Sequence, residues 1–328
     1  MRLPAFLFAS SLAGAGLLLA ACATGTSAPP ASPAAAPLAF APAPELPATE
    51  PAAAVPAPRL QPAAWAAPPV LGDLPAPRVS AAAAVVLDEA SGAALFEQAA
   101  DVRLPLASLT KIASALVVLE DGIPLDAEVT VDVDSRYMRG SSVMGLHAGD
   151  RFTVRDLLYG LMLPSGNDAA LALGRAVAGS DAAFVQRMND LMARLGLEDT
   201  NFANAHGLSA RDHYSTAWDL AVLSRYAMAN PQFAEIARAG HWVAHGSRTI
   251  ALNNVNSFLG YPGADGIKTG FTYRAGRTLV ASAVRDGRRL FAVLLNAPDR
   301  DGDAAALLDW AFANSEPAAS LQPPVASP

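Results

Sequence analysis

One apolar segment, residues 105–120, constrains this chain more than any other stretch, because it carries Ser108 and Lys111 three residues apart. Residues at this spacing on a helix share one face, with Cβ atoms about 5–6 Å apart. The rest of the segment is almost wholly apolar, which is typical of a buried helix, and Gly122 with Pro124 ends it. We therefore expect a buried helix with Ser108 and Lys111 at its start, facing a cleft.

Lys111 is unusual because the chain uses arginine for nearly all of its positive charge. Of the 23 lysines and arginines, only Lys111 and Lys268 are lysines. An arginine cannot lose its proton in a protein, whereas a lysine can when burial or a neighbouring positive charge lowers its pKa. A neutral lysine can accept the proton of an adjacent serine hydroxyl, which is otherwise a poor nucleophile. The pattern predicts a nucleophile at Ser108 and a general base at Lys111, although this spacing also occurs by chance.

Two further motifs follow along the chain. Ser165 and Asn167 lie in a short segment whose proline, glycine and asparagine predict a tight loop. Lys268, Thr269 and Gly270 lie in a segment whose pattern predicts a strand. The three motifs together, in this order and on a helix, a loop and a strand, are far more specific than any one of them.

In this order the motifs resemble those of the D-alanyl-D-alanine carboxypeptidases, the low-molecular-mass penicillin-binding proteins, and of the serine β-lactamases. The resemblance to the carboxypeptidases covers residues 81–313 and includes Val86–Gly92 and Asn204–Leu208. It implies a multi-domain α+β fold, with an antiparallel β-sheet flanked by helices and a mainly helical insert at about 125–240. It also implies a serine acyl-transfer enzyme for peptidoglycan stem peptides ending in D-Ala-D-Ala. No cofactor or metal ion is expected, and β-lactam antibiotics are expected covalent inhibitors.

The resemblance also implies roles for the polar side chains. Ser108 would attack the carbonyl of the penultimate D-Ala, and Lys111 would accept the proton of its hydroxyl. Ser165, with Lys268 nearby, would pass a proton to the amine of the leaving D-Ala. Asn167 would hold either the substrate amide or Lys111.

Main-chain groups are expected to stabilise the oxyanion. The backbone N–H groups of Ser108 and Phe271 would form the oxyanion hole, where one such donor contributes roughly 2.7–4 kcal/mol in a studied protease. Some members of the family have histidine after the lysine–threonine–glycine motif. Phe271 keeps the main-chain donor at that position but changes the wall of the pocket.

The free carboxylate of the terminal D-Ala needs cationic and hydroxyl partners. By resemblance, Lys268 and Thr269 would bind it beside Gly270, and an arginine further along the chain would assist. We choose Arg300, because it lies ten residues before Trp310 in the closing helix, as in relatives. The alternatives to Arg300 are Arg274 and Arg277.

Other activities are compatible with the same motifs. A D,D-endopeptidase that cuts peptidoglycan cross-links uses them equally. A class A β-lactamase would need a glutamate to activate water, and the nearest candidate, Glu198, aligns better with the carboxypeptidase pattern. A non-catalytic wall-binding lipoprotein is a further alternative. His206 is expected to have a structural role.

The N-terminal region predicts export and a lipid anchor. Residues 1–22 combine Arg2, an apolar run and small residues before Cys22, the only cysteine of the chain. This arrangement resembles the lipoprotein box of bacteria, in which the cysteine is lipidated, and the alternative is an ordinary cleaved signal. We expect the protein on the outer side of the cytoplasmic membrane, in the cell envelope, held to a membrane by the lipid on Cys22.

Composition divides the remaining chain. Residues 23–78 contain 15 prolines and 19 alanines and predict a disordered tether. Residues 79–313 are expected to form the catalytic domain and residues 314–328 a disordered tail. The net charge of −7 argues against nucleic acid as a partner. A single cysteine excludes an internal disulfide, and the five histidines show no metal-ligand spacing.

Residue periodicity predicts the elements of the folded region. A hairpin at 80–97 precedes the serine–lysine helix, and amphipathic helices follow between 125 and 240. Strands dominate after 240, and Asp286-Gly287 predicts a tight hairpin turn. The predicted helices are 154–163, 168–178, 181–195, 216–229 and 303–313, and the predicted later strands are 266–271, 278–284 and 289–295.

Overall fold

The computed structural model describes residues 72–315. The predicted signal segment, Cys22, most of the tether and residues 316–328 lie outside the described residues. All of the described residues belong to one compact unit.

The folded region is built on an antiparallel sheet of five strands, in the order β2-β1-β9-β8-β7. The predicted hairpins at 80–97 and around Asp286-Gly287 are both confirmed. Asp286 and Gly287 both have positive φ, which a tight hairpin turn requires. The strands are β1 (Ala83–Asp88), β2 (Ala94–Gln98), β7 (Ala264–Thr272), β8 (Gly276–Arg285) and β9 (Arg288–Leu295).

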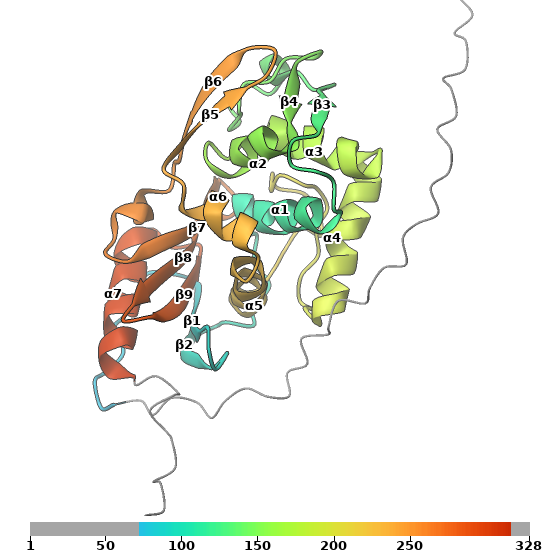
Figure 1. Cartoon of the computed structure of the whole chain (residues 1–328). Coiled ribbons are helices and arrows are strands. Elements are labelled where there is room, and N and C mark those ends of the chain that lie inside the picture. Colours follow the sequence, from blue (N-terminus) through green and yellow to red (C-terminus); the bar gives the residue numbers. More distant parts are fainter. Residues whose placement is uncertain (1–71, 316–328) are drawn as a thin grey trace, which may run out of the picture. The chain divides into compact units, whose positions relative to one another are not determined.

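Helices cover both faces of this sheet (Figure 1). Helix α7 (Arg300–Asn314) packs on one face, where its Leu307 joins a core with Val86 of β1. The opposite face, with Val85, packs against the larger core of the helical region. Successive side chains of a strand point to opposite faces. A sheet buried on both sides therefore has near-continuous apolar strands, which explains the sequence of β9.

Helix α1 (Thr110–Glu120), which follows the 3₁₀ helix η1 (Ala107–Leu109), lies at the centre of the helical region and contacts α2 to α6. Its burial confirms the expectation from its apolar composition. Polar N-caps such as Thr153, Ser180 and Thr216 begin the surrounding helices. These helices are α2 (Val154–Met162), α3 (Asn167–Ala178), α4 (Asp181–Leu195), α5 (Ala217–Met228) and α6 (Pro231–Arg238).

Two small hairpins extend the helical region. Strands β3 (Glu128–Thr130) and β4 (Arg151–Thr153) pair within the segment expected to be mainly helical. Strands β5 (His241–His245) and β6 (Thr249–Asn253) form a second hairpin outside the main sheet. The indole of Trp242 on β5 stacks on Tyr159 of α2 at 3.9 Å. The first strands after residue 240, β5 and β6, therefore pack on α2 through this contact.

The ends of the folded region differ from the predicted boundaries. The N–H groups of Gly72 and Leu74, which we assigned to the tether, donate to Asn314. Trp310 donates its indole N–H to the carbonyl of Leu74. Asn314 and Ser315, which we assigned to the tail, are buried. Both differences have one cause, since the two segments hydrogen-bond to each other at the end of α7.

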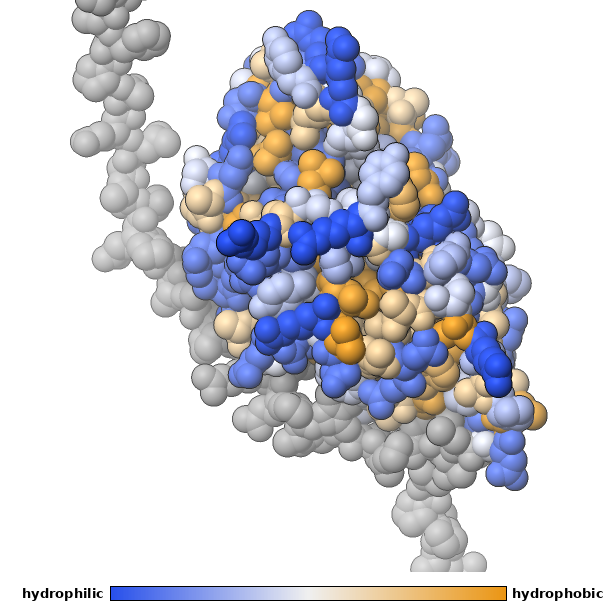
Figure 2. Space-filling view, turned by 180° about the vertical axis from the view of Figure 1, so that it is seen from behind, coloured by the Kyte–Doolittle hydropathy of each residue, from blue (hydrophilic) through white to orange (hydrophobic). Residues whose placement is uncertain are grey.

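The surface of the described region is mixed in character. Figure 2 shows a face on which hydrophobic residues form separate groups between polar ones. Within residues 72–315, every helix is too short or too polar to cross a lipid bilayer.

Candidate active site

Ser108 lies on a tight turn between two glycine contacts. It belongs to η1, and the preceding Ala107 has a φ of 51°, in the left-handed region. A Cβ on Gly207 would come within 2.0 Å of the carbonyl oxygen of Ala107. A Cβ on Gly270 would come within 2.9 Å of the backbone nitrogen of Ser108. Only glycine lets these two segments approach the turn so closely, so both help to position Ser108.

A buried hydrogen-bond chain supports this turn from behind. Thr110 donates its hydroxyl to the carbonyl of Ala107 at 2.8 Å. Nδ1 of His213 accepts the N–H of Ala203 at 2.9 Å, so the imidazole proton is on Nε2, which lies 2.8 Å from the hydroxyl oxygen of Thr110 and donates to it. Burial lowers the pKa of His213 to about 4, which keeps the ring neutral. Sequence reasoning missed His213, because no local pattern links it to Thr110.

Lys111 is fully buried, and its amine has three oxygen neighbours. Nζ lies 3.1 Å from Oγ of Ser108, 2.6 Å from Oδ1 of Asn167 and 2.6 Å from the main-chain carbonyl of His206. Of the two roles expected for Asn167, the structure has the contact with Lys111. The carbonyl of His206, rather than its imidazole, faces the lysine, and sequence reasoning did not anticipate that acceptor.

The environment of Lys111 favours its neutral form. Burial is the largest cause of a pKa well below the usual value, and the charge of Lys268 lowers the pKa further. Asp168 opposes both effects by raising it. A lowered pKa increases the share of the neutral amine, which is the form that can accept a proton as a general base must.

Ser165 and Lys268 also reach the site. Ser165 has a φ of 63°, and its buried Oγ has no hydrogen-bond partner among residues 72–315. Lys268 on β7 is buried, and its Nζ donates to the carbonyl of Thr269 at 3.1 Å. Burial, followed by the charge of Arg300, lowers the pKa of Lys268 to about 7. A buried hydroxyl without a partner is rare and indicates a place for a ligand or water.

Arg300 lies behind the edge strand β7. Its Nη1 donates to the carbonyls of Gly270 at 3.1 Å and Thr278 at 3.4 Å. Arg274 instead donates to Ala210 on the surface, and Arg277 is exposed. Of the three arginines considered, Arg300 is therefore the one that the structure brings to the lysine–threonine–glycine strand.

An exposed aromatic pair follows this motif on β7. The side chain of Phe271 is 57% exposed, and its ring meets that of Tyr273 edge-on at 5.7 Å. The backbone of Phe271 remains in the edge strand, next to the turn that holds Ser108.

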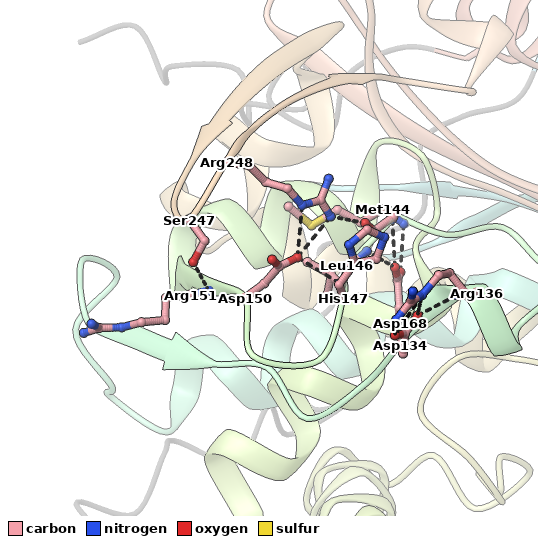
Figure 3. A network of polar contacts seen from close by, with 11 residues as sticks. Asp134, Arg136, Met144, Leu146, His147, Asp150, Arg151, Asp168, Ser247 and Arg248 are labelled. Carbon is pink, nitrogen blue, oxygen red and sulfur yellow. Dashed lines mark hydrogen bonds and ion pairs between the residues drawn. The ribbon is translucent and has the colours of Figure 1, made fainter.

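A loop of residues 134–150, here called the wall loop, contacts the start of α3, and Figure 3 shows its polar contacts, including those with Asp168. The carboxylate of Asp168 accepts the N–H groups of Met144 and Gly145, both at 2.8 Å, and of Leu146 at 2.9 Å. At the C-terminal end of the loop, Asp150 pairs with Arg248 of the β5–β6 hairpin at 3.0 Å. Asp168 directly follows Asn167, so the same helix start holds both the loop and Lys111.

The wall loop also contacts Asn167 itself. The amide nitrogen of the Asn167 side chain donates to the hydroxyl of Ser141, and the main-chain N–H of Asn167 donates to the carbonyl of Ser142 at 2.9 Å. Sequence reasoning missed this loop, although a conspicuous glycine and serine content at 140–149 offered a weak signal of a loop.

Glu198 is the candidate for the glutamate that a class A β-lactamase would use to activate water. Glu198 is exposed on the loop after α4. Within residues 72–315, no three histidine, cysteine, aspartate or glutamate side chains come together as a metal site would require.

The fold and the arrangement of motifs define the class of DD-peptidases. The DD-transpeptidase of Streptomyces K15 superimposes with a TM-score of 0.68 at 32% identity, covering 73% of this chain and 100% of that protein. Penicillin-binding protein 6B of Escherichia coli gives a TM-score of 0.69 at 37% identity, covering 74% and 81%. The predicted fold class, an antiparallel sheet flanked by helices, is confirmed.

Sequence comparison identifies the family. The profile of the D-alanyl-D-alanine carboxypeptidase family, peptidase family S11, matches residues 73–299, and the chain belongs to this family. D-alanyl-D-alanine carboxypeptidase DacC of Escherichia coli K12 is 38% identical over 267 residues, which are 76% of this chain and 65% of DacC. The chain thus spans less than two thirds of the length of this relative.

Proposed function

We propose that this protein is a serine-type D-Ala-D-Ala carboxypeptidase that removes the terminal D-Ala from peptidoglycan stem pentapeptides. The observation that carries the proposal is the buried amine of Lys111, 3.1 Å from Oγ of Ser108 and with a strongly lowered pKa. A neutral amine at that position makes the hydroxyl a nucleophile.

In the acylation step, Oγ of Ser108 attacks the carbonyl carbon of the penultimate D-Ala while its proton moves to Lys111. The backbone N–H groups of Ser108 and Phe271 stabilise the oxyanion. The peptide C–N bond then breaks, and the leaving amine takes up a proton delivered through Ser165, whose unpartnered hydroxyl is free to contact it. Asn167 keeps Lys111 oriented.

Deacylation regenerates the enzyme. Water adds to the ester carbonyl and gives its proton to Lys111, after which the C–O bond breaks and the oxygen of Ser108 regains a proton. The shortened peptide leaves with a new carboxylate. Each step needs only groups already at the site.

The terminal carboxylate of the substrate is bound by Lys268 and Thr269 beside Gly270. The charge of Arg300, held against the carbonyl of Gly270, makes this end of β7 electropositive. A free carboxylate next to the scissile bond is thereby recognised, which favours a carboxypeptidase over an enzyme that cuts internal bonds.

A carboxypeptidase of this kind acts in the cell envelope, with peptidoglycan as its substrate and β-lactam antibiotics as covalent inhibitors. Lipidation of Cys22 would hold it to a membrane. Metabolic labelling with a fatty-acid analogue tests this anchor, and equal labelling of Cys22→Ser would argue against it.

Acylation by benzylpenicillin tests the proposal directly. The full-length protein is incubated with the antibiotic, and intact mass with peptide mapping locates the adduct. We expect it on Ser108 in the wild type and absent in a folded Ser108→Ala variant. An adduct elsewhere would refute the assignment of the nucleophile.

Product analysis then separates the activities. Release of D-Ala from a pentapeptide indicates a carboxypeptidase, and cleavage of cross-linked dimers alone indicates an endopeptidase. Transfer to an added amine without hydrolysis indicates a transpeptidase, the activity named for the Streptomyces K15 protein. Rapid consumption of penicillin without a lasting adduct indicates a β-lactamase.

A further inference from the structure

The segment that leads into the sheet, residues 72–81, is held against both ends of α7. At the C-terminal end of the helix, the buried side chain of Asn314 accepts the N–H of Leu74 at 3.0 Å. At the N-terminal end, the buried carboxylate of Asp303 accepts the N–H of Ser80 at 2.8 Å and its hydroxyl at 2.7 Å. One polar side chain at each end of α7 therefore fixes the same segment.

The contact at the N-terminal end reaches the first residues of the helix. Asp303 also accepts the N–H of Ala81 at 3.1 Å. The hydroxyl oxygen of Ser80 in turn accepts the N–H of Asp299, the N-cap of α7, at 3.2 Å. Hydrogen bonds to a carboxylate are roughly twice as strong as those between neutral groups. The first turn of α7 is thereby fixed to the segment that enters β1.

Arg300 lies inside this fixed turn. It directly follows Asp299 and precedes Asp303 by three residues, which is about one helical turn. Its Nη1 donates to the carbonyl of Gly270 at 3.1 Å, and burial followed by the charge of Arg300 lowers the pKa of Lys268. The arginine side chain is only 15% exposed, so it has few alternative positions. A shift of the first turn of α7 would therefore move the guanidinium relative to the lysine–threonine–glycine strand.

We propose that Ser80 and Asp303 are positioning residues for recognition of the substrate carboxylate, because they fix the turn of α7 that presents Arg300 to β7. This inference rests on the proposed function. Both residues contact the start of α7 and would act on the substrate through Arg300. A contact with the terminal carboxylate exists in the bound substrate and in the transition state alike, so weakening it should raise KM and change kcat little.

The test compares KM and kcat for D-Ala release from a synthetic peptide that ends in D-Ala-D-Ala, using the full-length wild type, Ser80→Ala and Asp303→Ala. We expect KM to rise about threefold in Ser80→Ala and about fivefold in Asp303→Ala, with kcat within about twofold of the wild type. Ser80→Thr keeps the hydroxyl and should restore the wild-type KM. An unchanged KM in folded Ser80→Ala and Asp303→Ala would overturn the inference.

A double-mutant cycle with Arg300→Gln tests the route through Arg300. Arg300→Gln alone should raise KM about tenfold, because the guanidinium that faces β7 is lost. If Ser80 acts through Arg300, Ser80→Ala should raise KM no further in the Arg300→Gln background. An equal increase of KM by Ser80→Ala in both backgrounds would overturn this route.

Asn314→Ala is the matched control, since it removes the corresponding contact at the other end of α7. Thermal unfolding should show that Asp303→Ala and Asn314→Ala are both less stable than the wild type, but only Asp303→Ala should raise KM. An equal rise of KM in the two variants would assign the effect to loosening of the whole helix and overturn the inference. A wild type that releases no D-Ala would overturn the proposed function, and this inference with it.

Discussion

The only two lysines of the chain, Lys111 and Lys268, are both buried at one site, and the charge of Lys268 lowers the pKa of Lys111. The pKa of Lys268 is itself lowered to about 7 by burial and by Arg300. Positive charge near a buried base keeps that base deprotonated, so the substrate-binding end of β7 also tunes the nucleophile.

Both lysines should make the folded protein less stable at neutral pH than at alkaline pH. The pKa values of both lysines are lowered on folding. For Lys268 the unfolded state therefore binds more protons than the folded state between about pH 7 and about pH 10.5, and stability rises with pH in that window. Lys268→Met should be more stable than the wild type near pH 7 and should show a shallower slope. Urea unfolding at about pH 7 and about pH 9.5 measures this, and an identical slope in the variant would contradict the lowered pKa of Lys268.

Replacing Lys111 with arginine should abolish base catalysis. The guanidinium keeps the charge but cannot become neutral, so we expect acylation by benzylpenicillin to slow by about 10²–10⁴-fold. Stopped-flow acylation measures the rate, and circular dichroism establishes that the variant is folded. A rate close to that of the wild type would show that another group accepts the proton of Ser108.

Asp168→Asn should have two separable effects. The asparagine has one acceptor oxygen in place of two, so N–H groups of Met144, Gly145 and Leu146 lose partners, and stability should fall by about 1–3 kcal/mol. Loss of the negative charge should also lower the pKa of Lys111, which moves the acidic limb of the acylation rate to lower pH.

Asp150→Asn provides the control for this experiment. Asp150 also anchors the wall loop, through His147 and Arg248, but is not among the groups that shift the pKa of Lys111. The Asp150→Asn variant should be less stable than the wild type, but the acidic limb of its acylation rate should stay at the wild-type pH. If the acidic limb moves equally in the Asp168→Asn and Asp150→Asn variants, the shift arises from loosening of the wall loop and not from loss of the charge of Asp168.

The chain of His213, Thr110 and Ala107 should matter for acylation more than for substrate binding. His213→Phe or Thr110→Val should lower kcat about tenfold with little change in KM, because the turn that carries Ser108 loses its support. The double variant should be no slower than the worse single variant, since both changes break one chain. Fully additive losses would show that the two residues act independently.

Local sequence patterns predicted much of the fold. The apolar run of α1, the periodicity of α4 and α5 and the Asp286-Gly287 turn each depend on neighbours within a few residues, and all are present in the structure. Residue identity also identified Ser108, Lys111, Ser165, Asn167 and Lys268 as candidates, and the structure brings them to one site. Their catalytic roles stay predictions until the acylation experiments are done.

What the sequence by itself determined is which side chains could do the chemistry, because acid–base character belongs to the residue type. Only the tertiary structure decided how that chemistry is tuned. The carbonyl of His206 on Lys111, the hydrogen bond of His213 and the anchoring of the wall loop by Asp168 join residues far apart in the chain. A main-chain carbonyl is the same at every position, and burial that lowers a pKa arises only when distant segments pack together.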